Sequence, residues 1–178
     1  MSDIINNQKC SIRTVELEDA EALIEISASV ISEGDYFIVV SEELEKMSIE
    51  QEKEQIQKII NNDKETLIVA EINDVVVGSI VFRSNNKKRL SHTGSISMSL
   101  SRDYRGAGIG KILLQTLLDW AEKQPLIEKV SLGVFATNHR AISLYKSVGF
   151  IEEGRLIKEY KIDEDKYVDD ILMYKCVK

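Results

Sequence analysis

Three glycines, at positions 106, 108 and 110, mark the part of this chain best suited to bind a ligand. They separate an alternating apolar stretch that ends at Leu100 from the start of an amphipathic helical pattern. Glycine lets the backbone approach a ligand closely, and the N–H groups of a first helical turn carry the positive end of the helix dipole. Residues 100–110 therefore predict a cradle for a diphosphate group.

The glycine spacing differs from that of two common nucleotide sites. It does not follow Gly-x-Gly-x-x-Gly, and no Lys-Ser or Lys-Thr pair follows it as in a P-loop. The strand expected before the cradle comes after a hairpin and does not open a βαβ unit. These features disfavour a dinucleotide-binding or P-loop enzyme.

A second segment with functional residue types, residues 134–150, follows the next expected strand. Taken alone, Asn138 is more often a helix N-cap than a ligand contact, and Tyr145 more often packs in a core. Their position after the cradle favours a functional role, because two neighbouring parallel strands can open a cleft at their carboxyl ends. We therefore expect both segments to face one cleft.

Hydrophobic periodicity predicts the elements that position these segments. Asn73 and Asp74 predict a tight hairpin turn, and Ser48 and Gln51 have the spacing of a capping box. The order predicts one α/β domain over residues 1–178, with a mixed sheet of about six to seven strands and about four helices. We expect strands at about 10–15, 66–72, 75–83, 93–100, 129–135, 156–162 and 167–177. We expect one helix at about 18–30, a second that begins at 48, a third that follows the glycines and ends at about 123, and a fourth at 139–148.

Composition restricts the class of protein further. A length of 178 residues with 43% hydrophobic residues suffices for one core. The net charge of −7 argues against a general nucleic-acid binder. Cys10 and Cys176 lack the spacing of a zinc or redox motif, so we expect no metal. No apolar stretch approaches the roughly 20 residues that span a bilayer, which predicts a cytoplasmic protein without a membrane partner.

With both segments in register, the sequence resembles the GNAT superfamily of N-acetyltransferases. Residues 105–110 fit its R/Q-x-x-G-x-G/A pattern. The resemblance covers residues 66–174 well and the first 60 in outline, and runs 152–155 and 167–170 look most like the branch of ribosomal-protein N-terminal and spermidine acetyltransferases. The second motif of the family is matched in order by Asn138, Ala141, Leu144, Tyr145, Gly149 and Phe150.

The resemblance implies acetyl-CoA as cosubstrate and a primary amine or peptide N-terminus as acceptor, with direct attack in a ternary complex. It implies a coenzyme-binding core at about residues 93–150, a backbone N–H at Leu100 that polarises the thioester carbonyl, and Tyr145 as general acid for the leaving thiolate. The implied coenzyme-binding residues are Met98, Ser99, Leu100, Arg105, Gly106, Ala107, Gly108, Ile109, Gly110, Lys111, Asn138, Ala141 and Tyr145.

The general base is left open by the sequence. Where many relatives have a glutamate on the strand before the cradle, this chain has Ser95 and Ser97. Glu33, His92 and a water chain are the candidates.

An acceptor side is expected at about residues 18–62, where the acidic, irregular stretch 32–47 favours a recognition loop. Glu33, Asp35 and Tyr36 are its candidate substrate-binding residues. A catalytically silent acetyl-CoA sensor domain is the alternative function, which the presence of Tyr145 disfavours. The oligomeric state, monomer or homodimer, is open.

Overall fold

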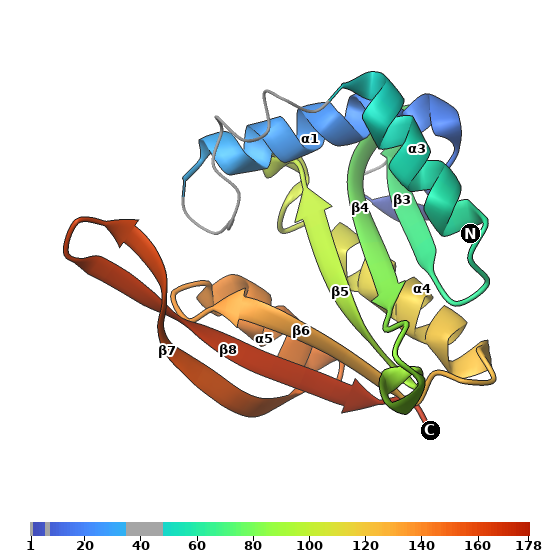
Figure 1. The fold of residues 1–178 in the computed structure, drawn as a ribbon. Helices are drawn as coiled ribbons and strands as arrows, with labels where there is room; N and C mark the ends of the chain where they lie inside the picture. Colours follow the sequence, from blue (N-terminus) through green and yellow to red (C-terminus); the bar gives the residue numbers. More distant parts are fainter. Residues whose placement is uncertain (1, 6–7, 35–47) are drawn as a thin grey trace.

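A mixed sheet forms the centre of the protein in a computed structural model that describes residues 2–5, 8–34 and 48–178. The described residues form eight strands in the order β1-β2-β3-β4-β5-β6-β8-β7 (Figure 1). The strands are β1 (Ser2–Ile5), β2 (Gln8–Thr14), β3 (Thr66–Ile72), β4 (Val75–Ser84), β5 (Thr93–Leu100), β6 (Lys129–Phe135), β7 (Ile151–Asp163) and β8 (Lys166–Cys176).

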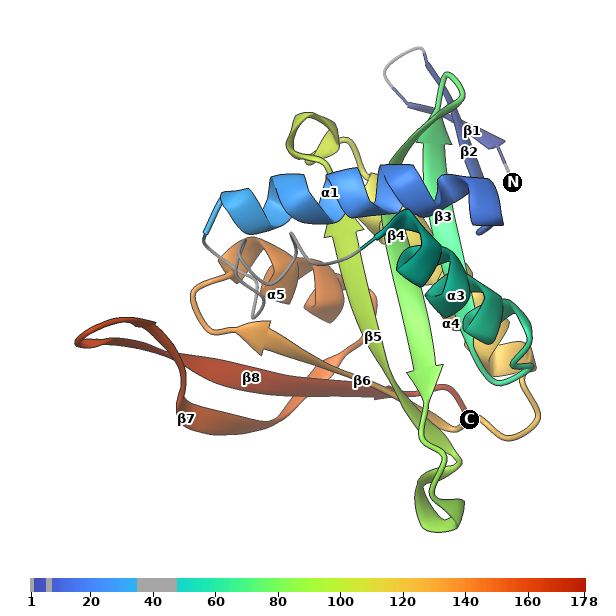
Figure 2. The same ribbon diagram turned by 45° about the horizontal axis from the view of Figure 1, so that its top comes forward.

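Four α-helices in the described residues cover the sheet. They are α1 (Ala20–Ser32), α3 (Ile49–Ile60), α4 (Ile109–Lys123) and α5 (His139–Ser147). Helices α1 and α3 lie on one face of β3, β4 and β5, and α4 lies on the other (Figure 2). None of these helices is long and apolar enough to cross a membrane.

The main core lies between the sheet and α4. The apolar side of α4 is fully buried there through Leu113, Leu114, Leu117 and Leu118, which recur at helical spacing. A second, smaller cluster lies between α1, α3 and β3 and includes Ile56. The two helix layers thus enclose the central strands of the sheet.

The pairing of β5 with β6 is short and shapes the candidate site. It is the one parallel pairing among the described strands, and it covers only three residue pairs, from Thr93–Lys129 to Ser95–Ser131. Beyond these pairs the two strands diverge, as Figures 1 and 2 show. The predicted splayed parallel strands are therefore confirmed.

Local signals account for much of this fold. Ser48 and Gln51 form the predicted capping box, with N–H to side-chain distances of 2.9 and 3.2 Å. Asn73 and Asp74 adopt positive φ angles of 49° and 63° in the predicted hairpin turn. The predicted bounds of β5 and β6 agree with the structure to the residue.

The amino-terminal and carboxyl-terminal edges of the sheet differ from the expectation. Strand β1 was not predicted and makes the sheet one strand larger than expected. Strand β7 starts at Ile151, before the expected residue 156, and contains register shifts and a left-handed residue, Lys158, at φ 56°. Nearly all of β7 is exposed, so it has no apolar alternation from which its start could be predicted.

Candidate active site

A cavity of about 890 Å³ lies where β5 and β6 diverge. Its wall comes from β5, the glycine loop, β6 and α5, with the carboxyl-terminal end of α1 at its margin. Of the residues predicted for the site, those that line it are Glu33, Met98, Ser99, Leu100, Arg105, Gly106, Gly108, Gly110, Lys111, Asn138, Ala141 and Tyr145. Ala107 and Ile109 do not line it, and Ile109 is 1% exposed in the core.

The glycine loop has the geometry of an anion cradle. Gly106 and Gly108 both have φ of +88°, a conformation that side chains rarely permit. Gly108 is the N-cap of α4, and a Cβ built on it meets no atom within 4 Å, so the loop is open to the cavity at this point. The unpaired N–H groups of the first turn of α4 thus face space that a diphosphate fits.

Gly110 has a different role from the other two glycines. A Cβ at this position would lie 3.3 Å from Leu144 Cδ2 and 3.6 Å from Met98 Cε. The absence of a side chain lets α4 pack closely on β5 and α5. Gly110 therefore sets the position of the cradle, while Gly106 and Gly108 shape its surface.

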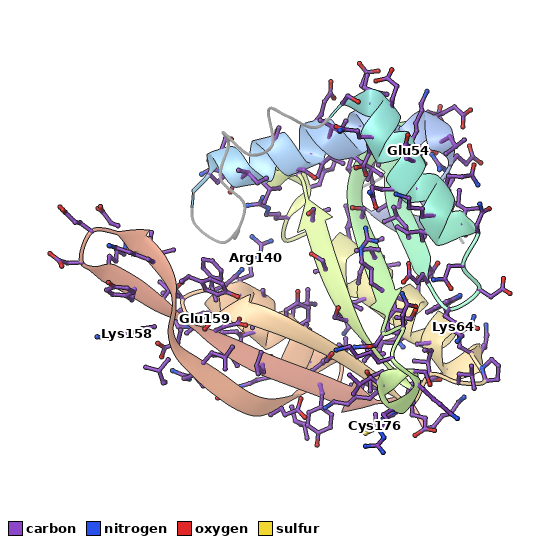
Figure 3. The ribbon with its side chains drawn as sticks, viewed as in Figure 1. Glu54, Lys64, Arg140, Lys158, Glu159 and Cys176 are labelled. Atoms are coloured by element: carbon purple, nitrogen blue, oxygen red, sulfur yellow. The ribbon has the colours of Figure 1, made fainter. Side chains whose placement is uncertain are left out.

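Arg140, which the sequence analysis missed, adds a cation to this wall. It lines the cavity, and its Nη2 lies 3.4 Å from the position of a Cβ built on Gly106. Figure 3 shows Arg140 in the space between the end of α1 and the tip of β6. A cation in the first turn of a helix opposes the helix dipole, and that unfavourable position was a usable signal for a phosphate-binding role.

The backbone of Leu100 points into the cavity. Ser101 N–H donates to the Val77 carbonyl at 2.9 Å, so the alternation of an antiparallel ladder makes Leu100 and Gly78 a non-hydrogen-bonded pair. The N–H and C=O of Leu100 must then point away from β4, toward the side that β6 has left. The Leu100 carbonyl indeed accepts a hydrogen bond from Arg105 Nε at 2.9 Å.

Arg105 also holds Glu33, which was a candidate base. Its two terminal nitrogens donate to the two Glu33 carboxylate oxygens, each at 2.7 Å. The hydrogen bond from Arg105 lowers the pKa of Glu33 despite the opposing effect of burial. A carboxylate with a lowered pKa is a weaker base, so this geometry favours a positioning role for Glu33.

Tyr145 and Asn138 lie on or next to α5 at the opposite wall. Tyr145 is 8% exposed, packs at 5.9 Å from the Phe150 ring centre, and has its pKa raised to about 12 by burial. Asn138 caps α5 by accepting a hydrogen bond from Ala141 N–H at 3.1 Å. The Asn138 side chain thus caps α5, and because it also lines the cavity it can contact a ligand there.

The structure does not bring His92 to this site. His92 precedes β5 at the end opposite Leu100, and its carbonyl accepts from Glu128 N–H at 2.8 Å. It does not line the cavity, so the geometry disfavours it as the base. The other two acceptor-site candidates, Asp35 and Tyr36, lie outside the described residues.

Comparison with known proteins shows which family has this sequence pattern and architecture. Residues 32–150 match the Acetyltransferase (GNAT) family. An N-alpha-acetyltransferase of Sulfurisphaera tokodaii is 30% identical over 88% of this chain and 89% of its own length. The chain matches 65%, 45% and 49% of the length of the first three curated relatives.

Solved structures agree with the sequence comparison. A GNAT-family acetyltransferase from Streptococcus pneumoniae has a TM-score of 0.89 at 26% identity, over 94% of this chain and 99% of that chain. A GNAT superfamily phosphinothricin acetyltransferase from Sinorhizobium meliloti, solved with acetyl-CoA, shares the fold with a TM-score of 0.83 at 18% identity, over 94% and 88% of the two chains.

The family model and the relative similar over most of both chains, on a shared fold, define the class of this protein. The chain belongs to the GNAT family.

Proposed function

We propose that the protein transfers the acetyl group of acetyl-CoA to a primary amine by direct attack in a ternary complex. The observation that carries the proposal is the parting of β5 from β6 after Ser95 and Ser131, next to a glycine loop with the geometry of a diphosphate cradle. One cavity thus has an anion site on one wall and an unpaired strand edge on another.

The coenzyme would bind along these two walls. Backbone N–H groups at the start of α4 and the Arg140 guanidinium would hold the diphosphate. The pantetheine arm carries amide groups, which can pair with the cavity-facing backbone of Met98 and Leu100 as an added strand would. The coenzyme-bound phosphinothricin acetyltransferase with the same fold supports this use of the cavity.

The chain's own groups supply the chemistry of transfer. The Leu100 N–H would donate to the thioester oxygen as negative charge develops on it, the kind of interaction that contributes most to acyl transfer. Neither cysteine lines the cavity, which supports direct attack without an acyl-enzyme. Tyr145 stays protonated at neutral pH and would donate a hydrogen bond to the leaving thiolate.

Tyr145 would act mainly by hydrogen bonding. Its pKa of about 12 lies well above the value of about 8.5 for a thiol, so complete proton transfer to the thiolate is uphill by about 5 kcal/mol. We therefore propose that the hydroxyl stabilises the thiolate as it leaves, and that the proton on the thiol product comes from the nitrogen of the adduct.

The acceptor is a primary amine or a peptide N-terminus. The similarity to an N-alpha-acetyltransferase over most of both chains supports a peptide N-terminus, and the shared fold of a phosphinothricin acetyltransferase allows a small molecule. A silent acetyl-CoA sensor is the alternative, and it predicts coenzyme binding without transfer.

One experiment tests the proposal in two stages. Thermal shift should show stabilisation by coenzyme A and acetyl-CoA, and much weaker stabilisation by ATP and NAD, which lack the pantetheine arm. Thiol release from acetyl-CoA should then be measured over polyamines, amino acids, aminoglycosides and short peptides. Equal shifts with ATP would contradict the coenzyme site, whereas binding without release on any amine would favour the sensor.

A further inference from the structure

Asp170 in β8 is a buried carboxylate with an unsatisfied oxygen. The residue is 5% exposed, and its Oδ1 has no hydrogen-bond partner among the described residues. Asp170 also forms no salt bridge within the described part of the chain. Burial of a carboxylate without a cation is costly, so such a group in a native fold calls for a ligand or a proton.

A glycine that lines the cavity brings this carboxylate next to the cavity wall. A Cβ at Gly133 would lie 2.6 Å from Asp170 Oδ2 and 3.0 Å from Oδ1, so the carboxylate lies where a side chain at position 133 would start. Gly133 lines the cavity, and the register pairs its neighbour Phe135 with Asp170 on the same face. Glycine in the interior of a strand is destabilising, and the close approach of the Asp170 carboxylate explains why a glycine occupies position 133.

Two aromatic rings frame the same spot. Phe135 and Tyr160 both line the cavity and stack at 4.2 Å between ring centres. The Tyr160 hydroxyl hydrogen-bonds with the Asp170 side chain. A carboxylate beside aromatic faces is a site for a cationic amine, because the ammonium is attracted to both.

Asp170, which lies against the cavity-lining Gly133, differs in its charge partner from Glu33, which itself lines the cavity. Arg105 neutralises Glu33 with two hydrogen bonds of 2.7 Å. The groups that face Asp170 are the Tyr160 hydroxyl and Glu159 carboxylate from β7 and the Val134 N–H from β6, and none of them is a cation. Asp170 is therefore the carboxylate that an incoming ammonium would meet unpaired.

Resting on the acetyl-transfer function proposed above, we infer that Asp170 binds the ammonium group of the acceptor and removes one proton from it before attack. The Asp170 carboxylate takes a proton from R–NH₃⁺, which leaves R–NH₂ and a neutral carboxylic acid. The nitrogen lone pair then forms a bond to the thioester carbon. The C–S bond breaks, the thiolate takes the second proton of the nitrogen, and Asp170 returns its proton to water.

The electrostatics of the site support this role. Burial raises the pKa of Asp170, the nearby Glu159 raises it further, and interactions with the Tyr160 hydroxyl and Val134 N–H lower it in part. A raised pKa brings the carboxylate closer to an alkylammonium, whose pKa is about 10, and so reduces the cost of the proton transfer. The rate should fall as pH falls through the raised pKa, because the protonated acid cannot accept a proton.

The test compares Asp170→Asn with Asp169→Asn, which makes the same charge change on the same strand. Asp169 accepts a hydrogen bond from Lys158 N–H at 2.8 Å and pairs with Arg155 at 3.5 Å, so its carboxylate has partners that Asp170 lacks. With an acceptor from the panel, Asp170→Asn should lower kcat/KM at neutral pH by about 100-fold or more, and the acidic limb of its pH profile should move from the pKa of Asp170 up to that of the amine, about 10. Coenzyme affinity should not change, and Asp169→Asn should behave as wild type in transfer.

An acceptor analogue separates a base from a structural residue. An amine with an electron-withdrawing substituent that leaves it uncharged at neutral pH needs no base, so Asp170→Asn should transfer to it nearly as fast as wild type does. An equal loss with both acceptors, or an acidic limb at the same pH as in wild type with the charged acceptor, would overturn the proposal.

Stability gives an independent readout. A folded-state pKa above the unfolded value means that ionisation costs more in the folded state, so the carboxylate destabilises the fold as pH rises through that interval. In urea titrations Asp170→Asn should therefore be more stable than wild type at neutral pH, with a smaller difference at acid pH. A large loss of stability would assign Asp170 to structure.

A second variant keeps the carboxylate and moves it. Gly133→Ala places a methyl group within 2.6 Å of the present Oδ2 position, so the carboxylate must shift and transfer should fall by about 10-fold or more. In an Asp170→Ala background the same substitution should cost nothing further. Additive losses would contradict the proposal.

If wild type acetylates no amine, the proposed function fails as well. If wild type is active and Asp170→Asn equals it, only the role of Asp170 fails.

Discussion

Arg105 connects the end of β5 with the end of α1 at the cavity. Its Nε donates to the Leu100 carbonyl at 2.9 Å, and its terminal nitrogens grip Glu33 at the end of α1. The planar fork of arginine makes these three bonds at once, which a lysine cannot do. The residue thereby fixes the strand end whose N–H is proposed to polarise the thioester.

Tyr145 allows a prediction at the same scale. Tyr145→Phe keeps the ring packed against Phe150 and removes the hydroxyl, so coenzyme affinity and melting temperature should stay close to wild type. Because the pKa of about 12 makes the hydroxyl a poor acid, single-turnover acetyl transfer should fall by only about 10-fold, below the usual span of acid catalysis. Wild-type transfer in this variant would remove Tyr145 from the mechanism.

At the scale of elements, the glycine loop and the start of α4 act as one unit. Gly108 has left-handed backbone geometry and caps the helix, and Lys111 N–H already bonds the Gly108 carbonyl at 3.0 Å. The N–H groups before Lys111 in the first turn have no partner within the helix. They are the donors that a diphosphate would use.

Gly108→Ala tests this unit, with Gly34→Ala as the matched control. Both glycines have positive φ, +88° and +72°, and a Cβ on either meets nothing within 4 Å, so the two variants carry a similar backbone strain of roughly 1–2 kcal/mol. Only Gly108 lines the cavity. Calorimetry should show coenzyme affinity reduced at least 10-fold in Gly108→Ala alone. Equal affinities in the two variants would mean that Gly108 only eases the turn.

Local sequence signals predicted the helices, turns and strands, but not the contact between Asp170 and Gly133 next to the cavity. Capping residues, turn residues and apolar alternation act within a few positions, so α3, the β3–β4 turn and β5 could be predicted from the sequence. Asp170 and Gly133 acquire their relation only through the pairing of β6 with β8. In the sequence alone Gly133 is one residue of an apolar run, and Asp170 is one of two adjacent acids in a strand.

The sheet has two parts, which are joined by one short stretch of parallel strand pairing. Strands β1 to β5 carry α1, α3 and α4, and strands β6 to β8 carry α5 (Figures 1 and 2). Between the halves, β5 and β6 share three residue pairs. The cavity lies where β5 and β6 diverge, so a ligand that touches both of its walls contacts both parts of the sheet.

Coenzyme A should therefore stabilise the cleft more widely than a ligand that reaches only the cradle. Hydrogen exchange should show protection of the amides at 98–100 and 105–111 and at the start of α5 with coenzyme A, because the proposed site pairs the pantetheine arm with β5 and sets the diphosphate against α4 and Arg140. ADP, which offers the diphosphate without the arm, should protect 105–111 and leave 98–100 exchanging as in the free protein. At about 100 times its dissociation constant, either ligand adds about 2.7 kcal/mol to the free energy of unfolding, so the comparison must be made at equal saturation. Equal protection of 98–100 by both ligands would contradict the pairing of the arm with β5.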